Sequence, residues 1–279
     1  MTLSNIAAMN AADQTNAINL LMGSSLEKLT TGLQINKSSD DVSGLAIADK
    51  LRTQQTSLTQ SIANGNSANA LIDIADKSLE NSGDLLDDIK AKLIQASTAT
   101  TSDEGREAIR KDISKLLEQI DNTAKNTTYN GVQLLATASG AATTSLTFQM
   151  GEKSTSTIET DGSVQANSEG LSLDGLRDLA SGGLTAAAAT TAIDTLDTAI
   201  TTLNGWRSDF GSTQNQITSS IENMISMNTN IADAESVIRD VDYEQETINY
   251  NKLNIQAQAG SFAISQANAM QQNILRLLQ

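Results

Sequence analysis

The sequence predicts a mainly α-helical protein, in which long antiparallel helices form coiled-coil bundles and a small β-hairpin region lies in the middle of the chain. Apolar or small residues recur at intervals of seven over six steps, as in a coiled-coil seam. The 279 residues include no proline, so no helix is interrupted by a missing backbone donor. Only 3% are aromatic, which disfavours a large globular core. The heptad positions are Leu51, Leu58, Gly65, Ile72, Leu79, Leu86 and Leu93.

The first element is an amphipathic helix that ends near residue 33. Its apolar row is thin and consists of Ala7, Ala11, Ile18, Met22 and Leu29. A polar joint follows, and a second helix starts near Ser43. Asp40 and Asp41 in this joint could form a paired-carboxylate site, but no base or second acid pair points to one. Capping and first-turn acids are the favoured interpretation.

The heptad run predicts a helix over residues 44–98. A single long core helix would use the same residues, but a helix of this length cannot bury its stripe alone, so a bundle is favoured. Ser102, Asp103 and Glu104 then supply a cap and early acids for a further helix that runs antiparallel to the first. The apolar row of that helix is Ile109, Ile113, Leu116, Ile120 and Ala124.

The middle of the chain predicts turns and hairpins. Asn130-Gly131 is a strong tight-turn signal, because both residues tolerate positive φ. Hairpins are expected over about 130–165, and helix returns from about 185. Gly205 and Gly211 lie inside that helix, where close packing against a neighbouring helix would explain them. Its apolar rhythm comprises Ile193, Leu196, Ile200, Leu203, Ile217, Ile221, Met224, Ile231 and Ala234.

The last helix follows a break at "RDVDYEQE" and carries two apolar rows, which make a wide apolar face. The first row is Leu253, Ala257, Gly260, Ile264, Ala267, Gln271, Ile274 and Leu278, and the second is Val241, Ile248, Ile255, Phe262 and Ala269. Free termini usually fray unless they are tied down. We therefore expect the two ends to pair with each other and with other copies, with Leu253, Ile264, Ile274, Leu278, Ile18 and Met22 buried only when neighbours arrive.

The composition excludes most catalytic chemistry. Without histidine or cysteine there is no Ser-His-Asp triad, thiolate nucleophile or histidine zinc site. Asp240, Asp242 and Glu244 begin like a calcium loop, but Gln245 and Asn251 stand where glycine and glutamate are needed. Helix capping by Asp242 with Gln245 is favoured. We expect a non-enzyme without metal or cofactor.

Charge and hydropathy limit the partners. The net charge of −15 argues against nucleic-acid binding. No run approaches the roughly 20 apolar residues of a membrane span. The N-terminal stretch "MTLSNIAAMNAADQ" has neither the basic flank nor the apolar core of a secretory signal peptide, so any export would use another route. The segments "STATTS" and "GEKSTSTIETDGS" could accept O-linked sugars.

Four segments carry a family resemblance. "LTTGLQINKSSDDVSGLAIADKLR" resembles the N-terminal signature of flagellins, "NTTYNGVQLL" is similar to the family's N-T-x-F-N-G-x-x-L-L, and "LTFQMG" to its L-x-x-Q-x-G strand. The C-terminal segment from Ile238 resembles the flagellin C-terminal domain nearly throughout. The resemblance covers roughly residues 1–150 and 185–279.

The resemblance implies a secreted subunit that polymerises into the extracellular bacterial flagellar filament for motility. Residues 1–33 with 241–279 would form an inner-tube coiled coil, 34–46 a spoke, and 47–240 an outer-tube domain without large additional domains. The spoke residues are Gly32, Leu33, Ile35, Asn36, Asp40, Asp41 and Gly44. Implied partners are other copies, hook–filament junction and cap proteins, and an export chaperone that holds the C-terminal helix before passage through the flagellar type III channel.

One departure concerns the vertebrate innate receptor for flagellin. Activating flagellins carry L-Q-R-V-R-E-L-A-V-Q, where this chain has "LDDIKAKLIQ". Asp87 and Asp88 fall on Q-R and Ala91 and Lys92 on E-L, which is similar to the branch that escapes the receptor.

The alternative functions are a hook–filament junction protein, which shares the terminal helices, and a flagellin with a metalloprotease insert, which would need the histidines that this chain lacks.

Overall fold

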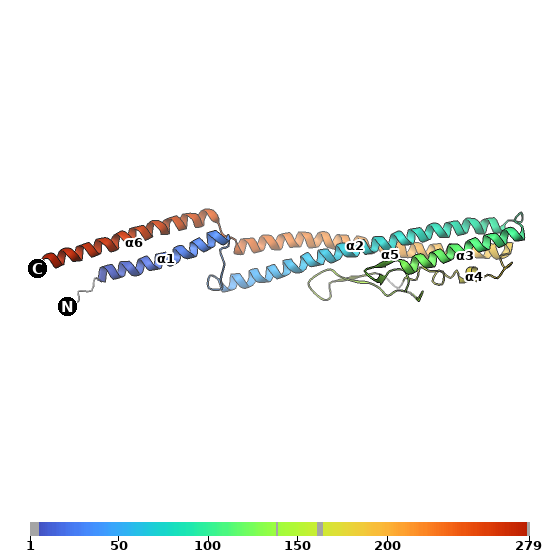
Figure 1. Ribbon diagram of the computed structural model, residues 1–279, viewed down its shortest axis with the longest axis horizontal. Coiled ribbons are helices and arrows are strands. Elements are labelled where there is room, and N and C mark those ends of the chain that lie inside the picture. The colour runs from blue at the N-terminus through green and yellow to red at the C-terminus, as the bar shows by residue number, and fades with distance from the viewer. Residues whose placement is uncertain (1–5, 138, 161–163, 278–279) are drawn as a thin grey trace. The chain divides into compact units, whose positions relative to one another are not determined.

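The computed structural model describes residues 6–137, 139–160 and 164–277, with side chains as far as Gln272. Five long helices dominate this part of the chain (Figure 1). They are α1 (Ile6–Thr31), α2 (Val42–Ser97), α3 (Asp103–Asn126), α5 (Ala186–Arg239) and α6 (Tyr243–Leu277). The chain divides into a terminal unit, residues 1–56 and 229–279, and a central unit, residues 57–228. The predicted fold class is confirmed.

The central unit is built on the seam of α2. Leu58, Ile72, Leu79, Leu86 and Leu93 are all buried, as the heptads predict, whereas Leu51, in the terminal unit, is half-buried. A second buried row interleaves with the first and is mostly small: Ser61, Ala68, Ala75, Ser82, Ile89 and Ala96. The alternation of large and small rows lets neighbouring helices approach closely.

Cross-helix contacts in the central unit show that α2 and α5 run antiparallel. Gln214 Nε2 donates to Asp73 at 2.7 Å, and Arg207 Nε donates to Asp76 at 2.9 Å. Further along, Lys90 Nζ pairs with Asp197. As the α2 number rises, the α5 number falls by a similar amount, so the two helices keep one register.

The helix α3 returns alongside α2 after a short turn. Its cap is as predicted: Ser102 Oγ accepts from Gly105 N at 3.1 Å, and the first turn carries Asp103 and Glu104. The predicted apolar row was wrong at one position, because Leu117 is fully buried and Leu116 is half-buried. The two leucines are adjacent and both lie near the helix's apolar face, so periodicity alone does not choose between them.

Two short hairpins follow α3. Strands β1 (Thr128–Tyr129) and β2 (Val132–Gln133) flank Asn130 at φ 50° and Gly131 at φ 82°, the two positive values that a type I′ turn requires. Strands β3 (Thr147–Gln149) and β4 (Thr157–Glu159) pair in antiparallel register. A single turn, α4 (Asp174–Arg177), precedes α5.

Gly205 and Gly211 do not behave as predicted. An added Cβ at either position would meet no atom within 4 Å in this chain, so close packing within the chain does not account for them. Close approach occurs at Gly65 instead, where a Cβ would lie 2.8 Å from Ile221 and Met150 side-chain atoms. None of the helices in the described ranges has the length and apolar character that a bilayer crossing requires.

Candidate functional site

The terminal unit contains a pair of antiparallel helices, α1 and α6 (Figure 1). The position of Gly260 against Thr15 fixes one level of the pair, since an added Cβ at Gly260 would lie 2.5 Å from the Thr15 hydroxyl oxygen. At another level Ser25 Oγ donates to Glu246 Oε1. The seam of α1 consists of Ala8, Ala11, Thr15, Ile18, Met22, Ser25 and Leu29. The seam of α6 consists of Glu246, Tyr250, Leu253, Ala257, Gly260, Ile264, Ala267 and Gln271.

This seam corrects one expectation about burial. Leu253 is only 7% exposed in the single chain, so it does not wait for a neighbour. Ile18, Met22 and Ile264 are already half-buried for the same reason, because each faces the other helix of the pair. Ala7 is exposed, Ala11 and Leu29 are half-buried, the side chain of Ile274 lies outside the described residues, and so does Leu278.

The second row of α6 is the exposed one. Ile248, Ile255 and Phe262 are 64%, 67% and 73% exposed, and Ala269 is exposed as well. Ile255 lies about 200° around the helix from Leu253 at about 100° per residue, so this row faces away from the seam. The face of α1 opposite its own seam carries Ile6, Met9 and Leu20, which are 68%, 60% and 78% exposed. Apolar rows on the outside of a helix pair mark surfaces that bind other protein.

The joint between α1 and α2 is closed by hydrogen bonds to the break between α5 and α6. Leu33 and Asp240 form an antiparallel bridge, in which Gln34 N donates to Arg239 O at 2.6 Å and Val241 N donates to Gly32 O at 2.9 Å. Gly32 has φ +76°, and an added Cβ would lie 2.9 Å from the Tyr243 hydroxyl oxygen. Only glycine adopts this conformation there without strain or displacement of Tyr243.

Within the joint, the two aspartates act separately. Asp41 Oδ1 accepts from Ser43 N at 2.9 Å and caps α2, as predicted. Asp40 is not a first-turn acid: its Oδ2 accepts from Lys37 N at 2.9 Å and Asn36 N at 3.0 Å, and so closes the turn before the helix. These two backbone hydrogen bonds lower the pKa of the Asp40 carboxyl.

The remaining spoke residues pack locally. Ile35 is buried and lies against Gly44, where an added Cβ would be 2.7 Å from Ile35 Cδ1. Asn36 Nδ2 donates to Leu33 O at 3.1 Å. At the far side of the break, Asp242 Oδ1 accepts from Glu244 N at 3.0 Å and Gln245 N at 3.1 Å. The predicted cap of the last helix is therefore confirmed.

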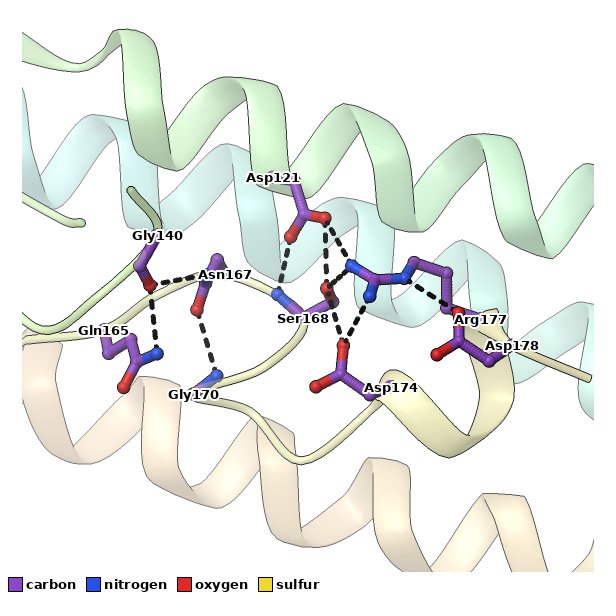
Figure 2. Close-up of polar contacts among 9 residues, drawn as sticks. All are labelled: Asp121, Gly140, Gln165, Asn167, Ser168, Gly170, Asp174, Arg177 and Asp178. Carbon is purple, nitrogen blue, oxygen red and sulfur yellow. Dashed lines mark hydrogen bonds and ion pairs between the residues drawn. The ribbon is translucent and has the colours of Figure 1, made fainter. Parts of the chain in front are cut away.

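A polar cluster in the central unit escaped sequence reasoning (Figure 2). Asp121 on α3 accepts from Ser168 N at 2.7 Å, from Ser168 Oγ at 3.0 Å and from Arg177 Nη1 at 3.2 Å. Arg177 also pairs with Asp174 and Asp178, and the Asp178 hydrogen bond, followed by the Asp174, Asp178 and Asp121 charges, raises the pKa of its guanidinium. The buried carboxylate of Asp121 thus has hydrogen-bond partners on both oxygens, and these bonds anchor the segment before α5 to α3. The sequence feature that could have indicated this cluster is Asp121 itself, a charged residue next to Ile120 in the apolar row of α3.

A second set of hydrogen bonds holds the loop before that cluster. Asn167 Nδ2 and Gln165 Nε2 both donate to Gly140 O, at 2.8 and 3.0 Å, and Gly170 N donates to Asn167 Oδ1 at 2.9 Å (Figure 2). In the described ranges, no three His, Cys, Asp or Glu side chains gather closely enough to hold a metal ion. The hydrogen bonds around Gly140 hold this loop in place.

The segment "LDDIKAKLIQ", residues 86–95, has one side that faces outward from α2. Asp87, Asp88 and Ala91 are exposed, while Leu86, Ile89 and Leu93 face the core. Lys92 is half-buried and its Nζ lies 3.1 Å from Asp112 Oδ2 on α3.

The chain matches two family models in the order that this architecture requires. The bacterial flagellin N-terminal helical region matches residues 3–140, and the bacterial flagellin C-terminal helical region matches residues 193–278. The chain belongs to the flagellin family. It is 30% identical over 286 residues to a flagellar filament 31.3 kDa core protein of Treponema maltophilum, covering 99% of this chain and 98% of the relative. It is 32% identical over 305 residues to a flagellin of Bacillus subtilis, with the same coverage.

Solved structures agree with this assignment. The crystal structure of Bacillus cereus flagellin matches with a TM-score of 0.50 and 26% identity, covering 62% of this flagellin and 94% of that chain. A putative flagellar hook-associated protein from Vibrio parahaemolyticus matches with a TM-score of 0.56 but 10% identity, covering 72% and 99%, and so shows the fold alone. The full-length match to filament proteins identifies a short flagellin, a structural subunit of the flagellar filament, and does not favour the junction protein.

Proposed function

We propose that this flagellin polymerises through the outward rows of α1 and α6, which neighbouring copies cover in the filament. The observation that carries the proposal is the exposed heptad row Ile248, Ile255 and Phe262 on the face of α6 opposite its own partner helix. In this assignment residues 1–33 and 241–279 form the inner part of the filament, residues 34–46 the spoke, and residues 47–240 the outer part.

The energetics favour a polymer over a dimer. Burying one large apolar side chain contributes about 1.5–3 kcal/mol, whereas association costs about 4–15 kcal/mol in lost translational and rotational freedom. A short row of such residues therefore supports only weak pairwise contact. A subunit that joins an existing filament end meets several neighbours at once and covers both rows, so growth from a seed is favoured over association of free monomers.

Seeded polymerisation of purified monomer tests the proposal. Phe262→Asp places a charge in the outward row, so filaments seen by light scattering and negative-stain electron microscopy should be lost, while circular dichroism of the monomer should be unchanged. Gln256→Asp is the matched control, because Gln256 is exposed on the same helix outside that row. Growth of Phe262→Asp at the unaltered rate would refute the outward-row interface. Failure of the unaltered chain to extend seeds would transfer the assignment to the junction protein.

Several partners follow from the same assignment. We propose export of the unfolded chain through the flagellar type III channel to an extracellular filament, a cytoplasmic chaperone that covers the exposed row of α6 before export, and junction and cap proteins at the filament ends. O-linked sugars on the exposed Ser and Thr side chains of segments 97–102 and 151–163 belong to this proposal. Within the second segment Thr160 is buried, and residues 161–163 lie outside the described residues. Mass spectrometry of secreted filaments reports both the sugars and any cleavage.

We also propose that this flagellin activates the vertebrate innate receptor poorly. Asp88 stands exposed where activating flagellins carry arginine, so an acid replaces a base on the outward face of α2. A reporter-cell assay with monomer should give a response at least tenfold below that of an activating flagellin, about 1.4 kcal/mol if binding alone decides it. Asp88→Arg should recover part of it, whereas Asp84→Arg, one turn away, should not. A response to the parent chain equal to that of an activating flagellin would overturn the proposal.

A further inference from the structure

The seam between α1 and α6 is poorly specified by its apolar residues. Most of its positions are alanine, glycine, threonine or half-buried isoleucine and methionine, and these repeat at intervals of seven on both helices. A slip of one heptad, about 10.5 Å along the axis at about 1.5 Å per residue, would bring similar residues into contact again. Two features constrain the register: the joint between residues 32–34 and 239–241, and the close contact of Gly260 with Thr15. Along the rest of the seam, apolar packing does little to distinguish one heptad register from the next.

A buried polar contact within the described part of the seam breaks the repeat. Ser25, only 3% exposed, donates its hydroxyl to Glu246 Oε1, and Asn249 Nδ2 donates to the same oxygen at 3.2 Å. Ser25 is the one serine in the α1 seam, and Glu246 is the one acid in the α6 seam. In a register slipped by one heptad, the carboxylate would face Ile18 or lie beyond the end of α1, and Ser25 would face Leu253 or lie beyond the start of α6.

We infer that Ser25 and Glu246 are the specificity-determining pair that sets the register of α1 against α6. A buried polar residue in a coiled-coil seam selects register because the slipped state leaves it without a partner. The joint between residues 32–34 and 239–241 supports the same register from one end, but it contacts only the last residues of the helices. The pair lies within the seam itself and disfavours arrangements that separate Ser25 from Glu246.

The consequence for assembly rests on the proposed function. The outward row of α6 is offered to neighbours at heights fixed by the register, so a slip of one heptad would displace Ile248, Ile255 and Phe262 by about 10.5 Å relative to α1. The register itself is a property of the monomer. It can be measured without any polymer, and a failure of the assembly proposal leaves the measurement valid.

The absence of cysteine makes disulfide trapping clean. Thr15→Cys with Gly260→Cys reports the native register, because an added Cβ at Gly260 lies 3.5 Å from Thr15 Cβ, within disulfide range. Thr15→Cys with Ala267→Cys reports a slip in one direction, and Ala8→Cys with Gly260→Cys reports a slip in the other. All three pairs replace only small side chains, and monomer concentration is kept low so that crosslinks form within one chain.

In the otherwise unaltered monomer, only the native reporter should close rapidly. Adding Ser25→Ala and Glu246→Leu should raise crosslinking of at least one slipped reporter about tenfold, because a slip then no longer leaves a buried hydroxyl and a carboxylate without partners. A cavity of about 170 Å³ beside Glu246, lined by Leu21, Lys28 and Asn249, leaves room for leucine. Ser24→Ala with Glu244→Leu is the matched control, since both residues are exposed on the same helices.

Two results would overturn the inference. The first is native-only crosslinking in the Ser25→Ala, Glu246→Leu chain, which would assign register to the joint. The second is equal slippage in the control variant. If Glu246→Leu prevents helix formation by circular dichroism, Ser25→Ala alone supplies the test, because it removes the donor and leaves the carboxylate in place. Glu246→Gln keeps an acceptor for Ser25, so in this variant only the native reporter should crosslink, as in the unaltered chain.

Discussion

The terminal and central units of this flagellin both carry apolar residues at intervals of seven, but they differ in whether those residues are buried within the chain. In the central unit, Leu79, Leu86 and Leu93 are fully buried, and the interleaved small row lets the helices close over them. In the terminal unit, small and polar residues alternate in the seam with half-buried apolar ones, while Ile255 and Phe262 face outward. One repeat therefore completes a core within the chain, and the other leaves a row of large apolar residues exposed on the single chain.

Placing a charge in the terminal seam should separate the two units most sharply. Ile264→Asp, like deletion of the last ten residues, should leave soluble, secreted monomer, because a carboxylate in the seam cannot be paired there. Seeded filament growth should be lost altogether, while fluorescence of Trp206, the single tryptophan and part of the central unit, should report an unchanged unfolding transition. Normal filaments from either variant would refute the role of the terminal pair.

Truncating one leucine in each unit measures how much each core contributes. Leu79→Ala should lower the free energy of unfolding of the central unit by about 2–5 kcal/mol, because the side chain is fully enclosed. Leu253→Ala should cost less than the lower end of that range, because its half-buried neighbours can relax. Denaturant titration followed by Trp206 fluorescence measures the first, and hydrogen exchange of α6 the second. Equal costs would show that the terminal seam is a true core.

Two glycines should respond to alanine with opposite signs. Gly32→Ala forces a positive φ and meets the Tyr243 hydroxyl, so we expect a loss of about 1–2 kcal/mol in the stability of the terminal unit. Gly205→Ala adds a methyl into open space in a helix interior and should stabilise the central unit by about 1 kcal/mol. Hydrogen exchange of the terminal unit measures the effect of Gly32→Ala, and denaturant unfolding followed by Trp206 fluorescence measures the effect of Gly205→Ala. A loss of stability in Gly205→Ala would indicate a contact at this position that the single chain does not show.

Acid should weaken the central unit through one half-buried ion pair, and this is the smallest of the expected effects. Arg110 donates two hydrogen bonds to Glu107, at 2.8 and 2.9 Å, and Gly182 N donates a third at 3.1 Å. The Arg110 bond, with the Gly182 bond next, lowers the pKa of Glu107 from 4.5 to about 2.

The folded-state pKa is below the unfolded one, so the stability from this pair is present above pH 4.5 and is lost as pH falls toward 2. Glu107→Gln should flatten the acid dependence of the Trp206 transition in that range. Glu118→Gln, an exposed acid on the same helix, should leave the slope as it is. An unchanged slope in both variants would assign acid sensitivity to other carboxylates.

Local rules explain which parts of the fold were predictable. The caps at Ser102, Asp41 and Asp242 and the turn at Asn130-Gly131 were read correctly, because each depends on residues within a few positions along the chain. The cluster around Asp121 was missed, because its partners lie 47 and 56 positions away. Asp40 was misread because a cap and a turn use the same carboxylate chemistry, and only the path of the backbone distinguishes them.

The sequence by itself determined that the chain forms long helices and that the last one has two apolar rows, since both follow from the spacing of residues along one helix. Only the tertiary structure decided which row faces α1. The choice depends on fit across the pair, where Gly260 accepts Thr15 and Glu246 meets Ser25. Helical periodicity is the same for both rows, so their difference appears only when a partner of defined shape and polarity lies against one of them.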